Sequence, residues 1–137
     1  MSNKDKIIEA LNKDLTMELA AIIQYMWQHV MATGMESPAF REKMKEVAIE
    51  EMRHAETFAE RIVWLGGVPS TQAAHIHVGG SLDKMIDANI KGEREAIDTY
   101  KSQLDLVRDD PVTHKMLVEI IQDEEEHLDF LLSLKGE

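Results

Sequence analysis

The sequence predicts an all-α protein, an antiparallel bundle of four helices with one long crossover between the second and the third. Apolar residues recur at spacings of three and four along four long segments. Glycine, proline, serine and aspartate separate these segments, and the 137 residues include only three prolines and seven glycines. A chain of this length is expected to form a single domain, residues 1–137, around one core.

Capping residues and glycines delimit the first two helices. The first is expected from about Ser2 or Asn3 to Ala32, with Gly34 closing it. The second is expected to begin with Ser37 as its N-cap and Pro38 at its first helical position. It should end at Gly66 and the glycine that follows.

Residues 66–80 form the one long connection. This segment is too long for a hairpin turn and suits a crossover along the length of the bundle. Ser81 should then cap a third helix that extends to about Arg108. A turn at residues 109–111 leads into a fourth helix, expected to reach about Lys135.

Each predicted helix has one inward line of residues, traced at spacings of three and four. On the first two helices these lines are Leu11, Leu15, Glu18, Ile22, Tyr25 and His29, and then Phe40, Met44, Val47, Glu51, His54, Phe58 and Ile62. On the last two they are Ile86, Ile90, Glu93, Ile97, Tyr100, Leu104 and Val107, and then Leu117, Ile120, Glu124, His127, Leu131 and Leu134. The lines are apolar except around their middles, so the functional residues are expected in the middle of the bundle.

Four carboxylates and two imidazoles interrupt these lines: Glu18, Glu51, His54, Glu93, Glu124 and His127. A lone buried carboxylate is costly unless its pKa rises enough to keep it neutral. Four buried together would repel one another strongly unless cations lay among them. Two divalent ions would balance the four carboxylates, and neutral histidines would complete the ligand sets. The pattern therefore predicts a centre that binds two metal ions.

The spacing within two of the segments supports this prediction. Glu51 and His54 are three residues apart, and so are Glu124 and His127. This spacing places both members of each pair on one face of a helix, where they can reach a common ion. A single such pair is weak evidence, but two pairs centred on inward lines are a much stronger signal.

The two halves of the chain repeat this pattern. Glu18 is followed seven residues later by Tyr25, and Glu93 seven residues later by Tyr100. Each of these glutamates precedes a Glu-x-x-His pair one helix further on. Glu95 is the alternative to Glu93, but a helix turns by about 200° between them, so only one can face inward. Glu93 is preferred because it shares the inward line with Tyr100.

The ligand types favour iron or manganese, which both accept carboxylate oxygen together with imidazole. The chain contains no cysteine, which excludes disulfides and iron–sulfur clusters and argues against a structural zinc site. Ligand type alone still permits adventitious zinc.

Three segments, LNKDLTMELAAIIQY, IEEMRHAETFAERIVWLGGVP and EIIQDEEEHLDFL, resemble the ligand helices of the bacterioferritins and, more broadly, of the ferritin-like superfamily. The paired Glu and Glu-x-x-His arrangement is known from the di-iron carboxylate proteins of that superfamily. The resemblance covers nearly the whole chain. It implies a ferroxidase with two iron ions per subunit that oxidises Fe(II) with O2 or H2O2.

The resemblance also implies roles for individual residues. By matching positions, Glu51 and Glu124 should bridge the two irons. The terminal ligands should be Glu18 with His54 and Glu93 with His127. Tyr25 matches a tyrosine close to that centre, where it would donate a hydrogen bond or an electron.

Two departures from the bacterioferritin pattern affect the expected assembly and haem content. Bacterioferritins have a short fifth helix that lines a symmetry axis of their 24-subunit shell, whereas this chain ends at Glu137. A homo-oligomer is expected, and a dimer and a 12- or 24-subunit shell both stay open, as does iron storage.

Met52 matches a methionine that binds haem between two subunits. The favoured interpretation is that Met52 instead packs at a lateral or dimer surface.

Two alternative functions stay open. The first is a rubrerythrin-like peroxide reductase, but Ala96 stands where those proteins carry an extra glutamate, and the cysteines of a rubredoxin domain are absent. The second is a metal-binding or assembly subunit without turnover.

Other features bear on partners and location. The net charge of −11, with no basic stripe, argues against a nucleic-acid partner. No segment is long and apolar enough to suggest a membrane span or a signal peptide, so a cytoplasmic protein is expected.

His75 and His77 in the long connection could chelate a metal, although packing explains their alternation equally well. Glu46 and Glu50 are expected on a solvated face.

Overall fold

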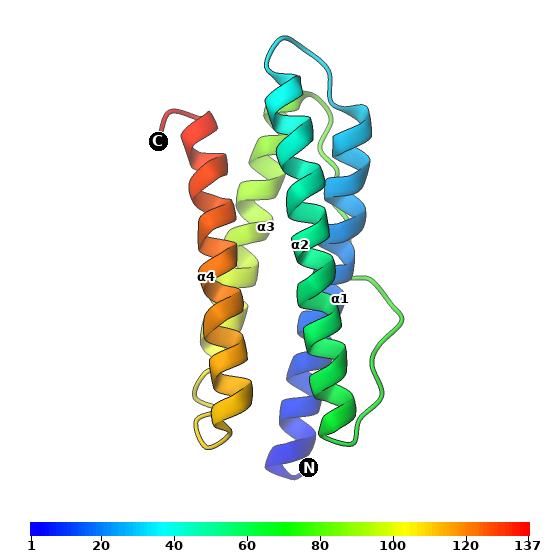
Figure 1. Cartoon of the computed structure of the whole chain (residues 1–137), viewed down its shortest axis with the longest axis vertical. Coiled ribbons are helices and arrows are strands. Elements are labelled where there is room, and N and C mark those ends of the chain that lie inside the picture. The colour runs from blue at the N-terminus through cyan, green and yellow to red at the C-terminus, as the bar shows by residue number, and fades with distance from the viewer.

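Four helices and no strands make up the protein, which confirms the predicted all-α class. The computed structural model describes residues 1–137. The helices are α1 (Asn3–Met31), α2 (Ser37–Trp64), α3 (Leu82–Ser102) and α4 (Pro111–Leu134). Consecutive helices α1 and α2 pack together, as do α3 and α4, and each pair runs antiparallel (Figure 1). The two pairs face each other across the interior of the bundle.

Side-chain caps explain where three of the helices begin. Ser2 accepts a hydrogen bond from the Asp5 backbone N–H and caps α1, which starts at Asn3, within the predicted range. Ser81 caps α3, and the Asp110 side chain caps α4 by accepting from the Thr113 N–H. These contacts satisfy backbone N–H groups that have no partner within the helix.

The predicted N-cap of α2 is wrong by one residue. Glu36 occupies the cap position without a side-chain bond, and Ser37 is the first residue inside the helix. The Ser37 hydroxyl donates to the Gly34 carbonyl at 2.7 Å, so it stabilises the preceding turn. Gly34 adopts a φ of 114° in that turn, a conformation that favours glycine.

The third helix ends at Ser102, six residues before the predicted end at Arg108. Tighter turns replace it over residues 103–109. There the Gln103 N–H donates to the Tyr100 carbonyl and the Leu104 N–H to the Lys101 carbonyl. The apolar line continues through these turns because Val107 remains buried, which is why the periodicity did not mark the end of the helix.

The crossover, residues 65–81, runs along α1 and in the same direction (Figure 1). Successive residues of the crossover contact successive turns of α1. Asn12 bonds the backbone of Val68 and Ser70, the Ala74 N–H donates to the Thr16 carbonyl, and Gln24 and Gln28 bond the backbone at residues 77–78. The connection is therefore attached to α1 over much of its length.

The apolar core has two parts separated by a polar layer. One cluster of 13 buried residues includes Leu11, Phe58 and Tyr100, and a second cluster of 10 includes Phe40 and Met44. In every helix the predicted ligand positions lie between the residues of these two clusters. Most residues of the predicted inward lines are buried, whereas Ile22, His29 and Leu104 are half-buried and Leu134 is exposed. None of the helices has the length and apolarity that crossing a membrane requires.

Candidate metal centre

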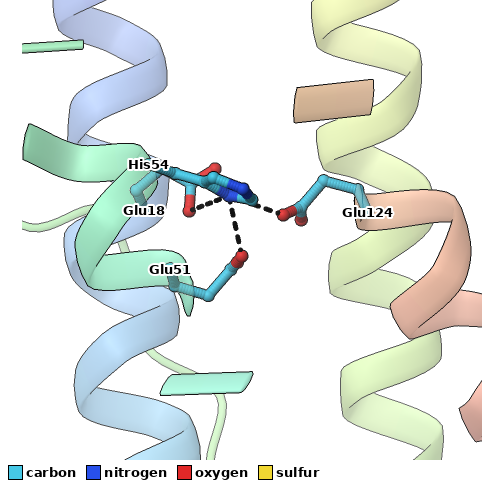
Figure 2. A group of neighbouring side chains, drawn as sticks. All are labelled: Glu18, Glu51, His54 and Glu124. Atoms are coloured by element: carbon cyan, nitrogen blue, oxygen red, sulfur yellow. Dashed lines mark ion pairs between the residues drawn. The ribbon is translucent and has the colours of Figure 1, made fainter. Parts of the chain in front are cut away.

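The structure brings all six predicted ligands into one buried layer. Their exposed fractions are 1% for each of the four glutamates, 5% for His54 and 4% for His127. They form two groups in which one ligand atom per residue lies within 4.8 Å of the others: Glu18, Glu51, His54 and Glu124, and Glu51, Glu93, Glu124 and His127. Figure 2 shows the first group, with side chains from α1, α2 and α4 pointing toward one another. Glu51 and Glu124 belong to both groups, as bridging ligands would.

Each histidine directs its Nδ1 atom at three carboxylates. His54 Nδ1 lies 3.1 Å from oxygens of Glu51 and Glu124 and 3.7 Å from Glu18 (Figure 2). His127 Nδ1 lies 3.6 Å from oxygens of Glu51, Glu93 and Glu124. The Glu-x-x-His spacing produces this convergence because residues three apart on a helix share a face.

Polar atoms without hydrogen-bond partners are concentrated in this layer. The buried unpartnered atoms here include one oxygen from each of Glu18, Glu51, Glu93 and Glu124 and the Nδ1 atoms of His54 and His127. Buried polar groups in proteins normally have hydrogen-bond partners, so six unpartnered atoms in one layer indicate that the layer binds a further group. Divalent cations would satisfy all six at once and offset four buried negative charges. The donors, carboxylate oxygen and imidazole nitrogen without thiolate, fit iron or manganese.

The outer nitrogens of both histidines face a second pair of carboxylates. His54 Nε2 lies 2.9 Å from Asp123 Oδ2, and His127 Nε2 lies 3.3 Å from Glu50 Oε2. Each acidic residue directly precedes the glutamate of the opposite Glu-x-x-His pair. The hydrogen bond between His54 Nε2 and Asp123 holds the proton there and leaves Nδ1 free to ligate a metal, whereas His127 Nε2 makes only an ion-pair contact with Glu50. Glu50 was expected on a solvated face, but it is half-buried and lies against the site.

Two tyrosines hold the terminal glutamates across the bundle. The Tyr25 hydroxyl donates to Glu93 at 2.5 Å, and the Tyr100 hydroxyl donates to Glu18 at 2.6 Å. Each tyrosine thus bonds the carboxylate of the other half of the chain. Burial, reinforced for Tyr25 by Glu93 and for Tyr100 by Glu18, raises the pKa of both phenols well above their usual value, so they remain donors. No role was predicted for Tyr100, although its spacing from Glu93 matches that of Tyr25 from Glu18.

Without cations the layer is electrostatically strained. Burial, followed by the charge of Glu18, raises the pKa of Glu51 well above its usual range, and burial beside Glu51 does the same for Glu124. Burial by itself would lower the pKa of His54, but the adjacent carboxylates of Glu124 and Glu18 outweigh this and raise the pKa to about 11. Protons thus supply part of the positive charge that the four buried carboxylates require.

Asp14 is a further buried carboxylate that the sequence analysis missed. It lies one helical turn before Glu18, is fully buried, and accepts a hydrogen bond from Gln103 at 2.7 Å. Burial raises its pKa to about 7, and the bond from Gln103 offsets only part of that rise. Because it belongs to neither ligand group, its effect is on stability.

Asp14→Asn should stabilise the protein increasingly as pH rises. The folded pKa exceeds the unfolded value of 3.8, so the stability that comes from protonated Asp14 is present at pH 4 and is lost as the pH rises toward 7. Asparagine removes the ionisation and should raise the free energy of unfolding by about 2–4 kcal/mol at pH 8, but by almost nothing at pH 4. Urea denaturation at both values measures this. Glu9→Gln, an exposed change on the same helix, is the control, and an equal gain for Asp14→Asn at both pH values would contradict the prediction.

Several other residues singled out in the sequence lie apart from the ligand groups. Glu95 is exposed and belongs to neither group. Met52 is 55% exposed on α2. His75 and His77 lie on the crossover, with their ring centres 4.3 Å apart.

Comparisons with known proteins agree with this geometry. Residues 8–136 match the family described as "Ferritin: Ferritin-like domain". The chain is 40% identical over 130 residues to a bacterioferritin of Desulfovibrio desulfuricans, which covers 93% of this chain and 73% of that protein. It is 32% identical over 134 residues to a bacterioferritin of Brucella melitensis, covering 96% and 83% of the two chains.

Solved structures give the same result for the fold. An X-ray structure of the Desulfovibrio desulfuricans bacterioferritin, described with its diiron site in different catalytic states, superposes with a TM-score of 0.91 at 38% identity, covering 98% of this chain and 80% of that one. A ferritin-like diiron-carboxylate protein from Bacillus anthracis superposes with a TM-score of 0.92 at 28% identity, covering 98% and 99%.

Proposed function

The chain belongs to the ferritin-like family, and on that basis we propose that residues 1–137 form one domain that acts as a di-iron ferroxidase of the bacterioferritin type. Its substrate is Fe(II), and its oxidant is O2 or H2O2. The observation that carries the proposal is the layer of six unpartnered ligand atoms, contributed by all four helices and closed above and below by apolar clusters.

The ligand roles follow from the two groups. Glu51 and Glu124, shared by both groups, would bridge the two ions. Glu18 with His54 would complete one ligand set, and Glu93 with His127 the other. Asp123 would keep His54 Nε2 protonated through its hydrogen bond, Glu50 lies 3.3 Å from His127 Nε2, and the tyrosines orient the terminal glutamates through hydrogen bonds. When bound as a pair, two Fe(II) ions supply the two electrons that reduce O2 to H2O2, or H2O2 to water.

Tyr25 is proposed to act next to the reacting ions. Its hydroxyl reaches Glu93, and its ring lies in the buried layer at 3% exposure. It orients that ligand, and the family resemblance identifies it as an electron or hydrogen-bond donor beside the centre. Tyr100 takes the same position toward Glu18.

Stopped-flow oxidation tests the proposed activity. Protein loaded anaerobically with Fe(II) and mixed with O2 or H2O2 should oxidise two Fe(II) per chain in a rapid phase, followed by slow oxidation of any excess. A rapid phase with peroxide alone would favour a peroxide reductase. If neither oxidant gives a rapid phase, the chain binds metal without turnover and the proposal is wrong.

We also propose that the exposed apolar face of α1 and α2 is a subunit interface. It consists of Ile23, Met26, Trp27, Val30 and Met31 on α1 and Ile49 and Met52 on α2. These side chains are 38–63% exposed, and exposed apolar surface favours association. A second copy of the chain is the expected partner, with Met52 packing against it and no haem bound.

Particle mass tests the assembly. Native mass spectrometry should show a dimer or a multiple of dimers, and Met52→Glu should shift the distribution toward monomer because it places a charge in an apolar contact. Met35→Glu, at a loop position that is 99% exposed, is the matched control. A Soret band that disappears in Met52→Leu would instead assign Met52 to haem. Storage of iron as a mineral would require a closed shell, which the same mass measurement detects.

A further inference from the structure

A cavity connects the buried ligand layer with the crossover. It has a volume of about 380 Å³ and lies between α1, α3 and the crossover segment. At its inner end it is lined by the four ligand glutamates and the two tyrosines, and on the crossover side by His75 and His77. Gly92 on α3 also lines it, and a Cβ placed there would meet nothing within 4 Å. The two histidines thus lie along one path with the ligands.

The backbone that carries this histidine pair is fixed in place. The Ala74 N–H donates to the Thr16 carbonyl at 2.9 Å, and the His77 N–H donates to Gln24 Oε1 at 3.0 Å. Gln28 donates to the Val78 carbonyl at 3.0 Å. The two imidazole rings, two residues apart on non-helical chain, have their centres 4.3 Å apart. The rings pack edge to face at an interplanar angle of 66°, and both side chains are exposed, so a cation from solvent can reach the two imidazoles together.

The polar groups that line the cavity favour a cation over an anion. One oxygen each of Glu18 and Glu93 is buried, has no hydrogen-bond partner and belongs to a residue that lines this cavity. Lys91 and Glu95 also line it with one charge of each sign, so the excess of carboxylates over cationic groups comes from the ligand residues at its inner end. A recess lined by one sign of charge concentrates ions of the opposite sign and speeds their capture.

We propose that His75 and His77 form an exchangeable divalent-cation site at the crossover end of this cavity, and that Fe(II) passes from it to the buried ligands. The proposal rests on the proposed function for the identity of the ion. Two imidazoles, with water completing the shell, bind more weakly than the carboxylate-rich centre. An ion captured at the histidine pair is therefore transferred inward.

Binding at the histidine pair can be measured without the buried centre. Glu51→Gln with Glu124→Gln removes both shared ligands while keeping their shape. Calorimetric titration of this variant with Co(II) should still show one weak site per chain, with paramagnetic shifts of the His75 and His77 ring resonances. Adding His75→Ala and His77→Ala should abolish that site, whereas adding His114→Ala, a histidine outside the cavity, should preserve it. Loss of Co(II) binding with His114→Ala, or its retention without His75 and His77, would overturn the proposal.

Transfer can be measured in the chain with all six ligands. Visible absorption follows Co(II) arriving at the buried centre after rapid mixing. His75→Ala with His77→Ala should slow this arrival about tenfold and leave the final stoichiometry of two Co(II) unchanged. Gly92→Leu, which fills the cavity without removing a ligand, should slow it as well.

Arrival at the wild-type rate in either variant refutes the route even if Fe(II) oxidation is confirmed. Absence of Co(II) from the buried centre of the wild-type chain would instead count against the proposed function, and the calorimetric result for the histidine pair would still stand.

Discussion

Glu18→Ala and Glu93→Ala should each abolish the rapid phase of Fe(II) oxidation. Each change removes one terminal carboxylate from an ion that must be held beside its partner for two electrons to be delivered together. Loss of a residue that only supports a metal ligand typically lowers affinity or activity about 10–100-fold, so loss of the ligand itself should have a larger effect. Stopped-flow absorbance with limiting Fe(II) measures the rapid phase directly.

The two variants also report on the pairing of the ligands. In Glu18→Ala, the group of Glu51, Glu93, Glu124 and His127 is intact, so one ion per chain should still bind tightly. Glu93→Ala should show the same stoichiometry at the opposite position. Glu95→Ala is the matched control, because Glu95 lies two residues along α3, is exposed and belongs to neither group. If Glu18→Ala and Glu93→Ala both keep the rapid phase, the assignment of the terminal ligands is wrong.

Removing the metal should destabilise the fold by a large amount. Each site filled at about 100 times its Kd adds about 2.7 kcal/mol to the free energy of unfolding, so two sites add about 5 kcal/mol. For a domain of this size, that corresponds to a rise in Tm of about 15 °C. The physical origin is the layer of four buried glutamates, whose mutual repulsion the cations offset. Thermal unfolding in EDTA and in excess Mn(II), which binds without being oxidised, measures the difference.

The stability of the metal-free protein should fall as pH rises from 5 to 9. Burial raises the pKa of Glu51 and Glu124 above their unfolded value of 4.5, so the stability that comes from their protonated forms is lost as pH rises. His54, with its pKa raised to about 11, acts in the same direction, since its contribution is complete below 6.5 and declines above it. Bound Mn(II) should flatten this dependence, because the ions replace the protons.

Glu51→Gln with Glu124→Gln provides the control. This variant lacks two buried charges, so its stability without metal should exceed that of the wild-type chain at pH 9, and Mn(II) should stabilise it little. Equal Tm values for the wild-type chain in EDTA and in Mn(II) would contradict the presence of a metal centre in this layer.

Most of the fold could be predicted because its signals are local. Helix periodicity depends only on the order of residues along each segment, and the caps at Ser2, Ser81 and Asp110 depend on a few neighbours. The prediction of α3 was six residues too long because Val107 keeps the apolar spacing after the helix has changed into tighter turns. Spacing reports which side of a segment is buried and does not report its hydrogen bonding.

The ligand layer was also visible in the sequence, for a related reason. Charged residues on lines that are otherwise apolar are costly to bury, and two matched sets of them indicated a shared occupant. The preference for Glu93 over Glu95 needed only the rotation of a helix per residue. The six candidate ligands could therefore be named before any contact between helices was known.

The sequence by itself determined the four helices, the inward face of each and the six residues that interrupt those faces. The tertiary structure decided which residues oppose one another: Tyr25 with Glu93, Tyr100 with Glu18, and the carboxylates of Asp123 and Glu50 with the histidines. It also placed His75 and His77 along a cavity that reaches the ligands. The reason is physical. The order of residues fixes the face of a helix, whereas the partner across the bundle depends on how the helices shift and rotate against one another when the whole core packs.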